Sequence, residues 1–289
     1  MTPFSKFSRV KKGVPSEKYL RIRLPGSFQW FIDPVSIEEL RAVFEEARNL
    51  QIPTKVLGGG TSIVCREIVE GLVIRLSHFN NAVFEEDGVV SGAGCTLSRL
   101  VMRAAMGGYA GLEGLAGIPG TVGGAVSKNS GFLSSIGNFI SQIAALDQRG
   151  NPVTIDRKHL GPDLSSSLSE FIVVGARFLL PRGNFSSSVR DFTHTLDAHK
   201  KKMPTNRRSV RIFRDEFSDG SPAKAVDILQ LSGCLGLFSG GASLCSQNPN
   251  FIVDAGSSTA GDILTLTSVV GGRVKKRFGK ELRLDLTTW

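Results

Sequence analysis

Glycine is concentrated in residues 111–131, GLEGLAGIPGTVGGAVSKNSG, which together with Gly108 hold eight glycines. Glycine has no Cβ and accepts positive φ angles, so such a segment lets backbone N–H groups approach a ligand closely. Successive N–H groups that point the same way form concavities that bind anions such as pyrophosphate. Pro119 fixes one φ angle and makes the turn rigid. The alternative is a glycine-rich buried turn. Because small or apolar residues, rather than linker-type Ser and Gln, fill most of the spaces, we interpret the segment as a phosphate cradle.

A second glycine segment, Gly58-Gly59-Gly60-Thr61-Ser62, follows a short strand predicted at residues 55–57. A strand, a glycine turn and two hydroxyls in this order suit a phosphate-binding turn. The motif is weak evidence alone, but two such segments together suit a long cofactor whose two ends must be held. A third glycine turn, residues 92–94, ends the strand predicted at 89–92.

The elements that must position these segments follow from the apolar spacing. Ser36 with Glu39 three residues later is a capping box that begins an amphipathic helix. Thr96 is predicted to cap a second helix. Thr259 with Asp262 is predicted to cap a long C-terminal helix, which ends at Gly279. The remaining predictions are a helix at 223–231 and strands at 19–32 (broken at Pro25-Gly26), 72–76, 141–147, 152–155, 171–181, 250–253 and 282–286.

Size and charge limit the classes of protein that are possible. A chain of 289 residues favours two or three domains, and 41% apolar with 21% charged residues is typical of a globular protein. The formal net charge of +9 favours anionic partners such as nucleotides or phosphosugars. No apolar run is long enough to span a membrane. Residues 1–16 are basic, and a frayed N-terminus is preferred to a transit peptide.

A basic run, KKKMPTNRRSVRIFR at 200–214, holds seven of the cations. It lacks interleaved aromatic residues, so a single-strand nucleic-acid platform is poorly supported. The run is interpreted as a solvated helix end and loop, with capture of a nucleotide-sugar pyrophosphate as the alternative. The chain has four cysteines with no CxxC spacing and four scattered histidines. We expect reduced structural cysteines and no metal site.

Several motifs resemble those of the UDP-N-acetylenolpyruvoylglucosamine reductase (UDP-N-acetylmuramate dehydrogenase) family of flavoproteins. LAGIPGTVGGAV at 115–126 matches that family's signature almost letter for letter. VLGGGTSIV, GAGCTLSRL, GGAS and NFIVDAG follow in the family's order at residues 56–64, 92–100, 240–243 and 250–256. The resemblance covers roughly residues 19 to 286.

The resemblance implies an α+β fold, with a two-domain FAD-binding module of the PCMH or vanillyl-alcohol-oxidase-like type and a smaller α+β substrate domain. The implied domains are residues 1–80 and 81–200 for FAD and 201–289 for a UDP-sugar. It also implies NADPH as hydride donor, peptidoglycan precursor synthesis in the cytoplasm, and a monomer that binds neither nucleic acid nor membrane. The implied FAD-binding residues are Gly58, Gly59, Gly60, Thr61, Ser62, Ile63, Val64, Gly94, Gly117, Ile118, Pro119, Gly120, Thr121, Gly123, Gly124 and Asn129.

The catalytic positions of the family are altered in this chain. The family's arginine falls on Ser165, and a hydroxyl cannot replace a guanidinium charge. The proton-donating serine falls on Arg211, or on Ile212 with another gap, and Ser209 is the nearest hydroxyl. The catalytic glutamate falls on Asp285. We therefore take Asp285, Arg211 and Ser209 as candidate catalytic residues.

Three activities fit this pattern. The first is the family's reductase reaction with a rearranged or slower site. The second is a flavin- or nucleotide-sugar-binding paralogue without reductase chemistry, and the third is a flavin enzyme with another substrate. All three retain FAD.

Overall fold

The computed structural model describes residues 3–131, 133–161, 163–206 and 208–289, and the chain divides into two compact units. Unit 1 comprises Met1–Gly13, Gln29–Gly59 and Glu70–Lys201, and unit 2 comprises Val14–Phe28, Gly60–Val69 and Lys202–Trp289. Each unit has its own hydrophobic core. The C-terminal segment thus shares unit 2 with two short N-terminal segments, while the division of residues 1–200 at residue 80 stays a prediction.

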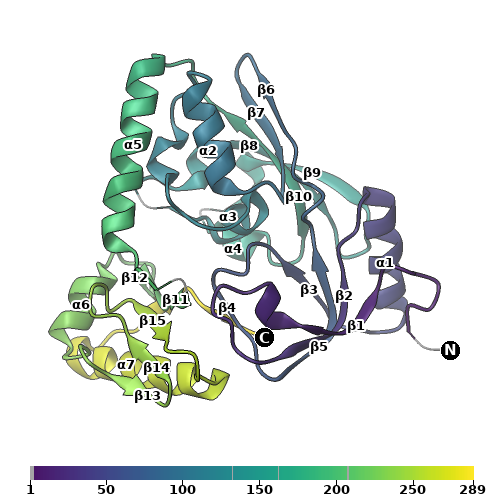
Figure 1. The fold of residues 1–289 in the computed structure, drawn as a ribbon. Helices are drawn as coiled ribbons and strands as arrows, with labels where there is room; N and C mark the ends of the chain where they lie inside the picture. Colours follow the sequence, from purple (N-terminus) through teal and green to yellow (C-terminus); the bar gives the residue numbers. More distant parts are fainter. Residues whose placement is uncertain (1–2, 132, 162, 207) are drawn as a thin grey trace. The chain divides into compact units, whose positions relative to one another are not determined.

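Unit 1 contains an antiparallel sheet with the strand order β6-β7-β10-β8-β9 (Figure 1). The strands are β6 Ala82–Glu85, β7 Gly88–Gly92, β8 Ile140–Leu146, β9 Pro152–Asp156 and β10 Ile172–Leu179. The pairing of β10 with β8 shifts register between Val173 and Gly175, and the Ala93 N–H donates to the Val174 carbonyl there at 2.9 Å. Such irregularities re-aim a strand end, and this one lies beside the predicted Gly92–Gly94 turn.

A second sheet has the order β1-β2-β5-β3, with β3 parallel to β5. Its strands are β1 Lys11–Pro15, β2 Ser27–Ile32, β3 Thr54–Leu57 and β5 Ile68–Arg75. Residues 19–24, predicted as a strand, form bends instead. Pro25 lacks an N–H and Gly26 follows it, so pairing of the strand begins only at Ser27.

Among the described residues, unit 1 has two helices where the apolar spacing predicts them and three further helices that were not predicted. They are α1 Ile37–Asn49, α2 Leu97–Met106, α3 Val122–Lys128, α4 Leu164–Ser167 and α5 Phe185–Lys202, with 3-10 turns at Leu112–Leu115, Ile136–Asn138 and Arg157–His159. Ser36 caps α1 by accepting from the Glu39 N–H at 3.2 Å. The unpredicted helices are α3, α4 and α5. The buried residues of α5, Ser188, Thr195 and His199, are polar, while Phe192 and Leu196 are only partly buried against the core.

The N-terminal segment is part of unit 1, and the expectation that it frays is wrong. Phe4 is 3% exposed and its ring meets that of Trp30 edge-on at 5.6 Å. Lys6 Nζ lies 2.6 Å from Glu46 Oε2 on α1. The burial of Phe4 accounts for the difference, because burying an aromatic side chain offsets part of the conformational entropy that the segment loses when it is ordered.

Unit 2 contains a sheet of order β11-β15-β14-β13 and two smaller pairs, β12 with β16 and β17 with β4. The strands are β4 Ile63–Val64, β11 Ser209–Arg211, β12 Phe213–Phe217, β13 Phe238–Ser239, β14 Ala242–Leu244, β15 Phe251–Asp254, β16 Leu282–Leu284 and β17 Thr287–Thr288. The helices are α6 Ala225–Leu231 and α7 Ala260–Phe278, with a 3-10 turn at Ser16–Lys18. The predicted capping box and the Gly279 end of α7 are confirmed.

The four cysteines are buried and none forms a disulfide with another described residue, as expected of reduced structural cysteines. In the part of the chain that the structure describes, no helix is both long and apolar enough to cross a membrane. Arg207 of the basic run lies outside the described residues.

Candidate functional site

Two of the predicted glycine segments meet in unit 1. Gly58 and Gly59 follow directly after β3. A Cβ on Gly59 would lie 2.6 Å from the Gly120 Cα, and one on Gly58 would lie 2.8 Å from the Thr121 Oγ1. Real Cβ atoms do not approach this closely, so glycine is needed at both positions for the two segments to touch.

The third glycine turn joins the other two. The Gly123 N–H donates to the Ala93 carbonyl at 2.8 Å, and a Cβ on Gly123 would lie 2.8 Å from the Ala93 Cβ. The Leu97 N–H donates to the Gly120 carbonyl at 3.0 Å, which ties the start of α2 to the same place. Segments around residues 59, 94 and 120 therefore form one backbone cluster, which we call the glycine cluster.

The glycines of this cluster have two different roles. The N–H groups of Gly94, Gly123 and Gly124 donate to the Phe79 carbonyl, the Ala93 carbonyl and the Thr121 Oγ1 at 2.8, 2.8 and 3.4 Å. The N–H groups of Gly58, Gly59 and Gly120 donate to no acceptor in the described ranges. The sequence interpretation directed all of these N–H groups at a ligand, whereas those of the first set already donate within the protein. Ligand binding by the second set stays a prediction.

The turn at residues 117–120 is rigid and is supported from behind. Gly117 and Gly120 have φ angles of 88° and 119°, which favour glycine, with Pro119 between them. A Cβ on Gly117 would lie 2.8 Å from Nδ1 of His199, a residue of α5 that is 9% exposed. Sequence reasoning considered His199 only as a metal ligand and missed this contact, because α5 itself was not predicted.

Asn129 ends α3 rather than standing in an open loop. It has the left-handed φ of 49° at the C-cap of this helix. Its Oδ1 accepts a hydrogen bond from the Gly137 N–H at 3.1 Å. This side-chain oxygen therefore closes the loop after α3, and contact between Asn129 and a cofactor stays a prediction.

The rest of the second glycine segment belongs to unit 2. Gly60 has a φ of 63°, and its carbonyl accepts from the Arg21 N–H at 2.9 Å. Ile63 and Val64 pair with the C-terminal strand β17. Because the Val64 side chain is fully buried in the core of unit 2, a cofactor contact at Val64 would have to use its backbone.

Two of the candidate catalytic positions lie next to one another in unit 2. The Asp285 N–H donates to the Ile212 carbonyl at 2.8 Å, and Phe213 pairs with Leu284 in the β12–β16 ladder. Asp285 and Arg211 are thus on adjoining stretches of chain. The Arg211 Nη2 lies 2.7 Å from the Asp215 Oδ2. Asp215 is itself held by accepting from the Ala225 N–H at the start of α6.

Ser209, the third candidate, is fully buried in β11 opposite Val253. Its hydroxyl has no hydrogen-bond partner among the described residues. The sequence interpretation required a loop shift to bring this hydroxyl into use, and here the shift would have to break strand pairing. Ser165, at the position of the family's arginine, lies in unit 1, where its Oγ donates to Asp163 Oδ1 at 2.7 Å.

Comparison with known proteins supports the predicted family. Residues 28–156 match the FAD binding domain family, and residues 200–289 match the C-terminal domain of UDP-N-acetylenolpyruvoylglucosamine reductase. The reductase of this name from Clostridium novyi is 26% identical over 282 residues, 96% of this chain and 91% of that protein. The one from Gloeobacter violaceus is 28% identical over 286 residues, 96% of this chain and 95% of that protein.

A solved structure supports the same assignment at the level of the fold. The crystal structure of UDP-N-acetylenolpyruvylglucosamine reductase from Thermus caldophilus aligns with a TM-score of 0.78 at 29% identity, covering 97% of this chain and 99% of that chain. The predicted α+β class, with an FAD-binding module followed by a smaller domain, is confirmed. The chain belongs to the UDP-N-acetylenolpyruvoylglucosamine reductase family.

Proposed function

We propose that this chain is an FAD- and NADPH-dependent reductase that acts on the enolpyruvyl ether of UDP-N-acetylglucosamine in peptidoglycan precursor synthesis. The observation that carries the proposal is the glycine cluster, in which segments far apart in the sequence meet with no room for side chains. The family of the curated relatives supplies the substrate.

The residues of the glycine cluster fit a dinucleotide cofactor. The N–H groups of Gly58, Gly59 and Gly120 donate to no acceptor within the described residues, and a pyrophosphate supplies acceptors for such groups. The implied FAD set named above would hold the cofactor, with Gly94, Gly123 and Gly124 shaping the backbone. When bound, FAD supplies the means to take a hydride from NADPH and deliver it to a substrate.

The chain's own groups must provide charge and a proton for the reduced substrate. Arg211 carries a charge but cannot release its proton, and Asp215 offsets that charge at 2.7 Å. Asp285 keeps the carboxyl of the family's glutamate on a side chain one methylene shorter. We therefore propose Asp285 as the group that holds the proton and Arg211 as electrostatic support.

A second function is favoured by the two hydroxyls. The Ser209 hydroxyl is buried in a strand, and the Ser165 hydroxyl is bound to Asp163. The first is closed to a substrate and the second already donates to a carboxylate, which supports a flavin- or nucleotide-sugar-binding protein without reductase chemistry. We keep this as the alternative.

The visible spectrum of the FAD-loaded protein under anaerobic conditions distinguishes the two. If the chain is a reductase, NADPH bleaches the flavin and the UDP-enolpyruvyl sugar restores the colour. UDP-N-acetylglucosamine, which lacks the enolpyruvyl group, is the matched control and restores nothing. We expect Asp285→Asn to slow recovery at least tenfold while leaving bleaching by NADPH unchanged. Bound flavin that NADPH does not bleach would support the alternative, and bleaching with no recovery on adding the enolpyruvyl sugar would indicate a flavin enzyme with another substrate.

We also propose that the protein acts as a monomer in the cytoplasm on small-molecule partners. The positive net charge suits anionic nucleotides, and the family's substrate and NADPH are both of this class.

A further inference from the structure

Asn250, a buried residue of unit 2, uses both ends of its side-chain amide on the backbone of one other residue. Its Oδ1 accepts a hydrogen bond from the Phe213 N–H at 2.9 Å, and its Nδ2 donates to the Phe213 carbonyl at 2.9 Å. Asn250 is 2% exposed. Loss of either bond would leave a buried polar group unpaired, so the pair of bonds fixes the position of Phe213.

The backbone of Asn250 holds the residue before Phe213. Its carbonyl accepts from the Ile212 N–H at 2.9 Å, and its own N–H donates to the Asn248 Oδ1 at 3.1 Å. Asn248 is 8% exposed, and its Nδ2 donates to the Lys202 carbonyl at 2.8 Å. Asn250 is therefore anchored itself and can hold both Ile212 and Phe213 in place.

This contact lies where the chain leaves one set of strands and enters another. Strand β11 ends at Arg211 and pairs with β15, whereas β12 begins at Phe213 and pairs with β16. Continued beyond the pair Arg211 and Phe251, the register of β11 with β15 would place Pro249 opposite Phe213. Proline has no N–H, so the backbone there cannot donate to the Phe213 carbonyl. The Asn250 side chain supplies that donor instead.

The two candidate catalytic residues Arg211 and Asp285 are both next to Ile212. Arg211 precedes Ile212 in the chain, and the Asp285 N–H donates to the Ile212 carbonyl at 2.8 Å. Ile212 is fully buried, whereas the side chains of Arg211 and Asp285 are half-buried. Ile212 thus bonds through its N–H to Asn250 and through its carbonyl to Asp285.

We infer that Asn250 positions Arg211 and Asp285 for the reductase reaction. It is a positioning residue, because its side chain is bonded to Phe213 and acts on the two candidates only through the backbone. Displacing a reacting group by about 1 Å can slow a reaction roughly 10²-fold, so a fixed backbone at this point matters to the rate. The inference rests on the proposed function, in which Asp285 holds the proton and Arg211 supplies charge.

Asn250→Asp is the variant that tests the inference. The two side chains have nearly the same shape, and a carboxylate still accepts from the Phe213 N–H but cannot donate to the Phe213 carbonyl. If circular dichroism shows that this variant is unfolded, Asn250→Ser takes its place, because serine is too short to keep both hydrogen bonds and introduces no buried charge.

Thr267→Val is the matched control. Thr267 is a buried residue of α7, and its Oγ1 donates to the Ile263 carbonyl at 2.7 Å. This variant also removes one buried hydrogen bond from a side chain to the backbone of unit 2, but at a place away from Ile212 and Phe213.

The first measurement is amide hydrogen exchange in the full-length protein with FAD, which does not depend on activity. The reference is the N–H of the buried Cys234, which donates to the Leu229 carbonyl at 3.1 Å elsewhere in unit 2. We expect Asn250→Asp to speed exchange of the Asp285 N–H about tenfold more than that of Cys234, because the opening is local. Thr267→Val should change both by the same factor. Equal changes at the two amides in Asn250→Asp would overturn the inference.

The second measurement is the recovery of NADPH-reduced flavin over a range of concentrations of the UDP-enolpyruvyl sugar. We expect Asn250→Asp to lower the limiting rate about tenfold or more. The half-saturating sugar concentration and the rate of bleaching by NADPH should stay within about threefold of the parent chain. Thr267→Val should leave all three unchanged. A raised half-saturating concentration with an unchanged limiting rate would also overturn the inference.

The same substitution in an Asp285→Asn background separates positioning from a general loss of structure. Once the carboxyl is gone, its position no longer matters, so Asn250→Asp should slow recovery further by less than about threefold. The same tenfold loss in both backgrounds would contradict the inference. If the parent chain shows no recovery, the proposed reductase function fails, and hydrogen exchange alone then decides whether Asn250 holds the stretch at Asp285.

Discussion

At the scale of single residues, the glycines of the cluster differ in what a side chain would disturb. Gly123 and Gly94 are packed against other backbone, so a Cβ there would first disturb the fold of unit 1. A Cβ on Gly94 would lie only 1.8 Å from the Leu76 carbonyl oxygen. Gly59 also meets backbone, that of Gly120, but the N–H groups of these two glycines donate to no acceptor in the described ranges. A substitution at Gly59 therefore tests ligand binding more directly.

We expect Gly59→Ala to weaken FAD binding about tenfold or more, because overpacking by one methyl costs roughly 1–3 kcal/mol. The added Cβ would lie 2.6 Å from the Gly120 Cα and would push the two segments apart. The measurement is the FAD Kd from quenching of flavin fluorescence, with bound flavin per chain as a second readout. An unchanged Kd would remove the glycine cluster from the FAD site.

Gly272→Ala is the control for this variant. Gly272 lies inside α7, and a Cβ there would meet nothing within 4 Å. Alanine is favoured over glycine in a helix interior by about 1 kcal/mol. This variant should bind FAD normally and be slightly more stable than the parent chain.

At the scale of elements, what could be predicted from the sequence depended on whether the residue types carried a local signal. The α7 helix has such a signal in Thr259, Asp262 and Gly279, and both of its ends are where these residues predict them. The α5 helix has a weaker signal, because Phe192 and Leu196 pack against the core at helical spacing but the buried residues Ser188, Thr195 and His199 are polar. These polar residues interrupt the apolar period, and the helix was not predicted.

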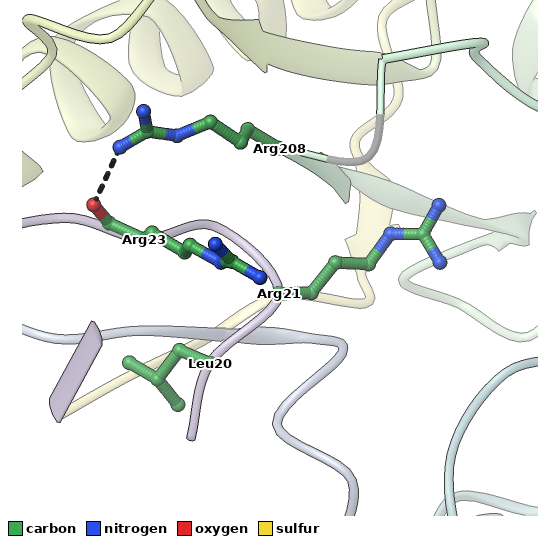
Figure 2. Close-up of a pocket in the computed structure, with 4 residues that line it drawn as sticks. All are labelled: Leu20, Arg21, Arg23 and Arg208. Carbon is green, nitrogen blue, oxygen red and sulfur yellow. Dashed lines mark hydrogen bonds between the residues drawn. The ribbon is translucent and has the colours of Figure 1, made fainter. Parts of the chain in front are cut away.

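The same contrast explains the candidate site. The glycine segments were recognisable because a backbone without side chains is itself the signal. That the N–H groups of Gly94 and Gly123 would donate to the Phe79 and Ala93 carbonyls could not be recognised, because these acceptors are distant in the sequence. The hydrogen bond from Arg208 to the Arg23 carbonyl (Figure 2) was missed for a similar reason, because these residues are 185 positions apart.

The capping box of α7 yields a prediction about coupling. The Asp262 N–H donates to the Thr259 Oγ1 at 3.1 Å, and the Thr259 N–H and Oγ1 both donate to Asp262 Oδ2 at 2.9 Å. Thr259→Ala should lower the free energy of unfolding by about 1 kcal/mol. The Thr259→Ala, Asp262→Ala double variant should cost less than the sum of the single losses, because the two variants remove the same bonds. Urea denaturation measures all three, and strict additivity would contradict the coupling.

The coupling also has a pH dependence. The Thr259 N–H and Oγ1 lower the pKa of Asp262. A carboxyl whose pKa is lowered by folding adds its full stabilisation above the pKa of the unfolded chain, about 3.9 for Asp. This stabilisation is lost as the pH falls through the lower pKa of the folded protein. The difference in stability between the parent chain and Asp262→Ala should therefore shrink in acid.

At the scale of the whole molecule, each of the two hydrophobic cores belongs to a unit whose segments are not consecutive in the sequence. The chain passes between the units after Gly13, Phe28, Gly59, Val69 and Lys201. The core of unit 2 includes Ile22, Leu24 and Val64 from the two N-terminal segments. Strand β17 pairs with β4, and the ring of C-terminal Trp289 meets that of Phe28 at 6.4 Å. The C-terminal segment is therefore an incomplete folding unit, although a family match spans it from residue 200.

This incompleteness predicts that a fragment of residues 202–289 does not fold cooperatively by itself. Each fully buried aliphatic side chain contributes about 1.5–3 kcal/mol, so losing Ile22, Leu24 and Val64 removes roughly 5–9 kcal/mol. That loss is comparable to the whole stability of a small domain, about 5–15 kcal/mol. We expect the fragment to show poor chemical-shift dispersion and a broad, non-sigmoidal urea transition.

The matched comparison joins residues 14–28 and 60–69 to the fragment through flexible Gly/Ser linkers. Because this fusion restores the missing core residues and the β4 partner of β17, it should regain a sigmoidal urea transition and dispersed amide signals. Replacing Ile22 and Leu24 by Ser in the fusion removes the restored core without shortening the chain, and should abolish the gain. A sharp cooperative transition in the bare fragment would mean that unit 2 folds without the two N-terminal segments. Recovery in the fusion and loss in its Ser variant would mean that the core of unit 2 is assembled from three separate stretches of the chain.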